Sequence, residues 1–207
     1  MRTRTDLASR CAAAAVAALW AAAASAVEPA ATTANLQAAF ENDVRARDRY
    51  RAFAERAERD GEPDAAALFR AAAHAEGVRA RLHGDTLRRL GAEPRPATAA
   101  VPTAGDTRAN LLAILGRENI ERATVYPSYV ERARRDAIPE AVLAFTLAHH
   151  AEASLVALYQ DAVAGRRPPR EHGDFHVCET CGYVVRGDPP ERCPVSLSPR
   201  GAFTRIP

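Results

Sequence analysis

The feature that most constrains the fold of this 207-residue chain is an internal repeat. Residues 50–76 and 126–152 carry matching residues at a constant spacing, which include the pairs Tyr50/Tyr126, Pro63/Pro139, Phe69/Phe145, His74/His150 and Glu76/Glu152. This many matches in one register indicate the duplication of a single structural unit. In each copy a proline follows a polar break and suits the first turn of a new helix, so the unit is a helical hairpin. Two hairpins joined by a long crossover predict a mainly α protein with a four-helix bundle.

The expected helices cover most of the chain between residues 34 and 165. Apolar residues at helical spacing, in an alanine-rich composition, mark stretches at residues 34–60, 63–90, 107–136 and 139–165. Thr32 or Thr33 is the candidate cap of the first helix, and Pro127 should kink the third. We therefore assign the chain to three parts: an N-terminal segment 1–26, a bundle 32–165 and a small Cys-containing module 174–207.

The first 26 residues have the pattern of an export signal. Three Arg accompany a short apolar run over residues 11–24, and Ala24-Ser25-Ala26 suits cleavage before Val27. The alternative is an uncleaved membrane anchor, but the run is short and alanine-rich for a bilayer span. This segment carries the whole formal net charge of +2, so the rest of the chain lacks the basic surplus that nucleic-acid binding needs. We expect a periplasmic or secreted protein without a membrane segment after cleavage.

Acidic residues fall on the inward faces of the expected helices. Glu76 and Glu152 each share a helix face with small and aromatic residues, and Glu118 lies one turn from Glu121. Buried carboxylates are costly unless they are paired, protonated or bound to a metal. In the general di-metal pattern of helical bundles, two helices give one carboxylate each and two give Glu-x-x-His. The sequence predicts a site for iron or manganese made of Asp43, Glu76, Glu118, Glu121 and Glu152.

The two histidines of that pattern are missing. Arg79 and Leu155 stand three residues after Glu76 and Glu152. A guanidinium among the acids would replace the charge of one metal ion. The sequence therefore leaves open whether the bundle binds two metal ions, one or none. Four other histidines are better interpreted as packing or surface residues than as metal ligands: His74, His150, His83 and His149.

The C-terminal module has the spacing of two metal-binding knuckles. Cys178-x-x-Cys181 is followed by Cys193-Pro194-Val195-Ser196, so that Ser196 stands at the fourth ligand position. A serine oxygen is a harder donor than a thiolate and should lower both metal affinity and reduction potential. The spacing predicts a single iron or zinc. The alternative is a Cys178–Cys181 disulfide in an oxidising compartment, with Cys193 free.

Together these stretches resemble rubrerythrin, a non-haem di-iron protein with a ferritin-like four-helix bundle and a rubredoxin-like tail. The resemblance covers about residues 34–207 and is carried by AFENDVRARDRY, FRAAAHAEGVRARL, GRENIERATVYPSY, LAHHAEASLVALYQ and FHVCETCGYVVRGDPPERCPVS. It implies that electrons pass from iron in the cysteine module to a di-iron centre, which reduces hydrogen peroxide to water. It also implies a homodimer.

Carried over by position, the resemblance implies a role for each candidate residue. The iron ligands of the bundle would be Asp43, Glu76, Glu118, Glu121 and Glu152, and those of the single iron or zinc would be Cys178, Cys181, Cys193 and Ser196. Tyr50 and Tyr126 would lie near the metals, and the candidates for catalysis are Glu118, Glu121 and Tyr50. The electron donor is not identified, and export would separate the chain from cytoplasmic donors. Because both centres depart from the family pattern, two alternatives stay open: a metal-poor scaffold or binding protein in which Arg79 replaces metal charge, and a metal store or buffer.

Overall fold

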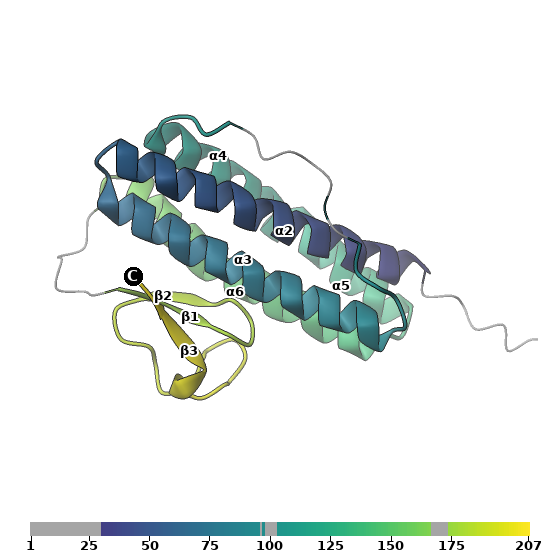
Figure 1. Cartoon of the computed structure of the whole chain (residues 1–207). Helices are drawn as coiled ribbons and strands as arrows, with labels where there is room; N and C mark the ends of the chain where they lie inside the picture. The colour runs from purple at the N-terminus through teal and green to yellow at the C-terminus, as the bar shows by residue number, and fades with distance from the viewer. Residues whose placement is uncertain (1–29, 96, 98–102, 167–173) are drawn as a thin grey trace, which may run out of the picture.

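The computed structural model of the chain describes residues 30–95, 97, 103–166 and 174–207. The expected export signal and its cleavage position lie outside these residues. Two pairs of long helices pack side by side, and a small three-stranded sheet lies against one flank of them (Figure 1). The predicted mainly α bundle with a small C-terminal module is confirmed.

The first helix pair consists of α2 (Ala30–Arg59) and α3 (Pro63–Arg89). Gly61, with a φ of 74°, makes the left-handed turn between them, and Pro63 lies in the first turn of α3. The prediction that Thr32 or Thr33 caps the first helix is wrong, because α2 already runs through both residues. The buried Thr32 hydroxyl instead donates to Asp136 Oδ2 at 2.6 Å and ties the start of α2 to the second helix pair.

The second helix pair contains an irregular turn that lies before Pro127, whereas the sequence predicts a kink at Pro127 itself. In place of one kinked helix over residues 107–136 there are α4 (Thr107–Ile120), a π-helical turn η1 (Glu121–Val125) and α5 (Tyr126–Arg135), followed by α6 (Pro139–Val163). Pro127 has no N–H, and its ring would collide with the carbonyl four residues earlier in a regular helix. The wider turn, closed by a hydrogen bond from the Tyr126 N–H to the Glu121 carbonyl, accommodates the proline before a kink is needed.

Small side chains let the helices approach closely in the core. Ala71, Ala72 and Ala75 of α3 are fully buried, and the repeat-related Phe69 and Phe145 fill the wider spaces. In the described part of the chain, α6 alone is long and apolar enough to cross a membrane, by length and composition. Its apolar face packs inside the bundle, as expected for the core helix of a globular domain.

The C-terminal module is a sheet of three short antiparallel strands in the order β2-β1-β3. The strands are β1 (Phe175–Cys178), β2 (Val184–Arg186) and β3 (Phe203–Ile206), with a 3₁₀ turn η3 (Arg200–Ala202) before β3. Phe175 pairs with Arg186 on one side and with Ile206 on the other. A unit this small buries little surface by itself, and its apolar side chains join the core of the bundle: Phe175, Val177, Val184 and Ile206.

Candidate functional site

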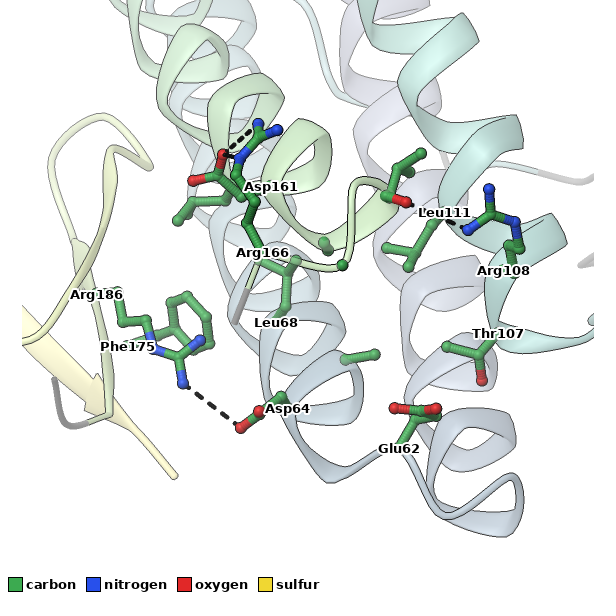
Figure 2. A pocket seen from close by; sticks show the side chains of 15 residues that line it. Glu62, Asp64, Leu68, Thr107, Arg108, Leu111, Asp161, Arg166, Phe175 and Arg186 are labelled. Carbon is green, nitrogen blue, oxygen red and sulfur yellow. Dashed lines mark hydrogen bonds and ion pairs between the residues drawn. The ribbon is translucent and has the colours of Figure 1, made fainter. Parts of the chain in front are cut away.

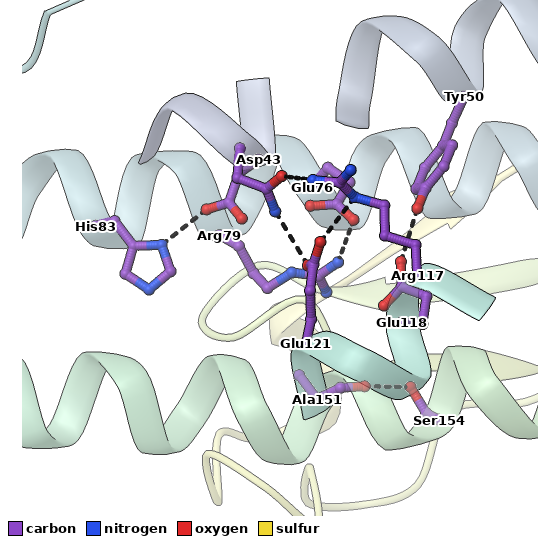
Figure 3. A network of polar contacts seen from close by, with 11 residues as sticks. Asp43, Tyr50, Glu76, Arg79, His83, Arg117, Glu118, Glu121, Ala151 and Ser154 are labelled. Carbon is purple, nitrogen blue, oxygen red and sulfur yellow. Dashed lines mark hydrogen bonds and ion pairs between the residues drawn. The ribbon is translucent and has the colours of Figure 1, made fainter. Parts of the chain in front are cut away.

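Four acidic side chains from four helices lie in the buried core of the bundle. Asp43 comes from α2, Glu76 from α3, Glu118 from α4 and Glu152 from α6, and each residue is at most 3% exposed. Figure 3 shows three of them facing one another across the helices. Tyr50 of α2 also reaches this core, where its hydroxyl donates to Glu118 Oε1 at 2.7 Å.

Arg79 lies inside this group of acids. Its side chain is fully buried, and Nη2 donates to Glu76 Oε1 at 2.6 Å, one turn away on α3 (Figure 3). The other two guanidinium nitrogens, Nε and Nη1, have no hydrogen-bond partner among the described residues. Although burial alone would lower the pKa of Arg79, the charges of Glu76 and Glu152 raise it, so the guanidinium stays a permanent cation in the core.

His83 is the functional residue that sequence reasoning ranked too low. It is fully buried on α3, and its Nδ1 lies 2.7 Å from Asp43 Oδ2, while Nε2 has no partner in the described structure. His83 follows Arg79 by four residues on the same helix face, and this spacing was the available signal. His74 instead lies at the surface and bonds Glu179, and His150 is exposed, in agreement with the packing or surface roles expected for both.

The carboxylates on the second helix pair are held differently. Glu121 opens the π-helical turn and points toward the rim, where Oε1 bonds Arg117 Nε at 2.7 Å and Oε2 accepts from Asn42 at 3.0 Å. Glu118 and Glu152 point inward, and the Oε2 atom of each is buried without a partner among the described residues. Buried polar atoms of this kind need a proton, a water molecule or a cation.

Burial dominates the proton affinities of this core. It raises the pKa of Glu76 and of Glu152 well above the ordinary range, and the surrounding carboxylates raise both further against the opposing effect of Arg79. Burial also raises the pKa of Tyr50, with the Glu118 carboxylate adding to it. Burial thus shifts Glu76, Glu152 and Tyr50 toward their neutral forms.

The three cysteines of the module form a second cluster. Cys178, Cys181 and Cys193 are buried free thiols whose sulfur atoms all lie within 4.8 Å of one another, so the structure does not contain the alternative disulfide. The Sγ atoms of Cys181 and Cys193 are 3.7 Å apart, close to the roughly 3.8 Å between thiolates that share a tetrahedral ion with bonds of ~2.3 Å. Ser196 Oγ lies 3.4 Å from Cys178 Sγ, on the same cluster.

One of these thiols is prepared to bind a metal. Hydrogen bonding from Cys181 and from Ser196, opposed by burial, lowers the pKa of Cys178 to about 5. The same interaction raises the pKa of Cys181, which carries the shared proton. The thiolate that a metal needs thus already exists at neutral pH. The donor set of three sulfurs and one hydroxyl fits a single tetrahedral iron or zinc.

The module places this cluster directly on the helix that carries Arg79. Gly182, which follows Cys181, has a φ of 80°, and a Cβ there would lie 2.9 Å from the Ala75 carbonyl and 3.3 Å from Arg79 Nη1. The Val184 N–H donates to Ser154 Oγ of α6 at 3.0 Å, two residues after Glu152. The two candidate centres therefore adjoin each other within one chain.

A pair of metal ions does not fit the bundle core in this arrangement. Among the described residues, the cysteines are the sole set of three or more His, Cys, Asp or Glu whose ligand atoms all lie within 4.8 Å of one another. Glu76 is already hydrogen-bonded to Arg79, and Asp43 to His83. The buried Leu155 offers no ligand atom. Two further cations would also lie close to a fixed guanidinium charge.

A further cavity lies apart from both clusters. A cavity of about 290 Å³ opens between the end of the bundle and the module (Figure 2), and none of the predicted site residues lines it. Its charged groups are engaged with the protein: Arg186 with Asp64, Arg166 with Asp161, and Arg108 with the Val163 carbonyl. The cavity carries no chemistry connected with the carboxylates or the cysteines.

Comparison with known proteins gives consistent results. The family model described as Rubrerythrin matches residues 34–160. Nigerythrin of Nitratidesulfovibrio vulgaris is 31% identical over 173 residues, which cover 84% of this chain and 85% of that protein. Rubrerythrin of the same organism is 31% identical over 182 residues, which cover 83% and 92%.

The solved structures agree in fold. Nigerythrin in its fully reduced, all-ferrous state superposes with a TM-score of 0.77 at 31% identity, over 84% of this chain and 86% of that one. Symerythrin of Cyanophora paradoxa, at 24% identity and a TM-score of 0.57, shares the fold alone over 65% of this chain and 84% of its own. From the family match and these relatives, we conclude that this chain belongs to the rubrerythrin family.

Proposed function

We propose that this chain is an exported redox protein that accepts electrons at its cysteine module, passes them to the carboxylate core and reduces hydrogen peroxide. The family supports this proposal, since rubrerythrins are di-iron proteins that reduce peroxide and also hold iron at a cysteine-rich module. Export rests on the pattern of residues 1–26, and N-terminal sequencing of chain recovered from the periplasm of an expressing bacterium should begin at Val27.

The observation that carries the proposal is the contact between the two clusters. Gly182 of the cysteine knuckle packs on Ala75 and Arg79, the residues that flank Glu76 on α3. Iron bound by the three thiols would supply one-electron transfer at this place. Since even an added Cβ at Gly182 would collide with the Ala75 carbonyl, the knuckle and α3 are in direct contact there, and electrons would pass between them within one chain.

The side chains of the core can provide the protons. Reduction of hydrogen peroxide to two water molecules consumes two electrons and two protons. Burial raises the pKa of the Glu76 and Glu152 carboxyl groups and so favours their protonated forms, and the Tyr50 hydroxyl donates a hydrogen bond to Glu118 Oε1. These groups would donate hydrogen bonds or protons to an oxygen atom in the core, in a space that excludes bulk water.

The test uses the mature chain loaded with iron, reduced anaerobically and freed of excess reductant. Added hydrogen peroxide should be consumed, and the visible bands of the oxidised cysteine-bound iron should return as that iron gives up its electron. Glu118→Gln should slow consumption by about tenfold or more, and Glu140→Gln, at an exposed position on α6, should not. Consumption no faster than that by the same concentration of free iron would refute the proposal.

A second candidate, a metal-poor scaffold, is favoured by the buried ion pair of Arg79 and Glu76. In that case the protein supplies its own cation, and a chelator should leave the melting temperature of the helices unchanged. A fall of several degrees on chelation would exclude the scaffold. The homodimer implied by the resemblance stays a proposal, to be checked by light scattering of the eluted chain.

A further inference from the structure

The acids of the bundle core divide into two halves that differ in how their oxygen atoms are satisfied. On the α2–α3 side, Asp43 and Glu76 each bond a buried nitrogen donor of the protein, His83 Nδ1 at 2.7 Å and Arg79 Nη2 at 2.6 Å. These four side chains are at most 4% exposed, so the partnership is internal and shielded from solvent.

On the α4–α6 side the acids lack such partners. Glu118 Oε2 and Glu152 Oε2 are buried and make no hydrogen bond in the described structure, and neither does the hydroxyl of Tyr159 on α6. Glu118 is held in place through its other oxygen, which accepts from Tyr50. Three unsatisfied oxygen atoms at nearly full burial, on side chains of two facing helices, are a costly arrangement unless something binds them.

We propose that the bundle holds one hard divalent metal ion, bound by Glu118 and Glu152, and that the Arg79 guanidinium stands where a second ion would be. Rubrerythrins hold two ions in the bundle, so this chain departs from its own family. The proposal shares with the proposed function only the presence of a metal in the bundle.

The charges of the bundle core support one ion rather than two. The four buried acids carry at most four negative charges, and Arg79 supplies one permanent positive charge beside them. Its Nε and Nη1 atoms, which have no hydrogen-bond partner in the described part of the chain, still carry positive charge in the core, and this charge opposes a second cation nearby. Arg79 also stands in place of the histidine that the di-metal pattern has three residues after Glu76, so the second position lacks a nitrogen ligand as well.

The donor atoms indicate the class of metal. Carboxylate and phenol oxygens without imidazole nitrogen or sulfur suit Mn²⁺ and Fe²⁺ better than copper or zinc. Mn²⁺ is therefore the appropriate probe, because the thiols of the module bind it weakly and the count then reports on the bundle.

The experiment counts Mn²⁺ bound per mature chain from the loss of the free-ion EPR signal, with circular dichroism to confirm that each variant is folded. We expect one ion per chain, and at least a tenfold weaker affinity in Glu118→Gln and in Glu152→Gln. Glu140→Gln should bind as the unchanged chain does, because Glu140 is exposed on the same helix as Glu152.

Arg79→His tests the place of the second ion, because it removes the guanidinium and offers an imidazole. This variant should bind two ions per chain and show the spin coupling of a close pair. A folded variant that still binds one would overturn the role given to Arg79. No bound ion, two ions in the unchanged chain, or binding that ignores Glu118→Gln would each overturn the single site.

Metal counting also separates this inference from the proposed function. One ion bound with no peroxide turnover would leave the single site in place and refute peroxide reduction. Peroxide turnover by a chain that binds no ion in the bundle would refute the single metal site and leave peroxide reduction in place.

Discussion

Arg79 and Glu76 form an ion pair whose side chains are 0% and 4% exposed. Removal of one partner from such a pair leaves an uncompensated charge or forces a costly protonation. Arg79→Met, which keeps much of the volume, should lower the free energy of unfolding of the metal-free chain by about 3 kcal/mol. The double variant Arg79→Met/Glu76→Gln should recover most of that loss, as measured by urea unfolding. An equal loss in both variants would mean that Arg79 acts through packing alone.

The buried carboxyl groups predict an unusual dependence of stability on pH. Burial raises the pKa of Glu76 and of Glu152, so the folded metal-free chain keeps protons that the unfolded chain releases above its ordinary pKa of about 4.3. The folded state then binds more protons, and the free energy of unfolding falls as pH rises from that value toward the raised pKa. Each group contributes up to about 1.4 kcal/mol per pH unit.

Urea unfolding of the chelator-treated chain between about pH 5 and pH 8 measures this slope. Glu152→Gln should flatten it, since the amide neither gains nor loses a proton. A stability that rises over this range would show that these acids are ionised in the folded chain.

Among the helices, the π-helical turn Glu121–Val125 sets which way the preceding acids face. Insertion of one alanine after Ala123, whose side chain is exposed, would add a residue that this turn has not taken up and should rotate α4 against α5 by about 100°. Glu118 would then leave the core, the unfolding free energy would fall by about 2 kcal/mol or more, and metal binding would be lost. Ala123→Ser keeps the length and should change neither, as checked by calorimetry and metal analysis.

The helices themselves could be predicted because their signals are local. Pro63 and Pro139 mark two helix starts, Asp106 caps α4 through a 2.7 Å bond from the Ala109 N–H, and the repeat fixes which helices pair. The π-helical turn could not be predicted, since it answers a clash between Pro127 and a carbonyl that arises only in the folded helix. The pairing of His83 with Asp43 was also out of reach, because those residues meet across two helices.

For the whole molecule, the junction between module and bundle includes one close backbone contact, at Gly182. Gly182→Ala would place a methyl group 2.9 Å from the Ala75 carbonyl, in a left-handed conformation that alanine disfavours. We expect a loss of about 1–3 kcal/mol in unfolding free energy and slower electron transfer from the module. Gly201→Ala, with open space around the new Cβ, should change the free energy of unfolding by no more than about 0.5 kcal/mol. Equal effects of the two variants in thermal unfolding would show that this junction is loose.

The repeat that organises the bundle has one further consequence, at positions 79 and 155. These equivalent places in the two copies hold a buried guanidinium and a buried leucine. A scaffold built from two like halves thereby carries a positive charge at this position on α3 and an uncharged side chain at the equivalent position on α6. A nitrile group placed at residue 155 would report the electric field of the Arg79 guanidinium as a shift in its stretching frequency. This shift should disappear when the Arg79 charge is removed.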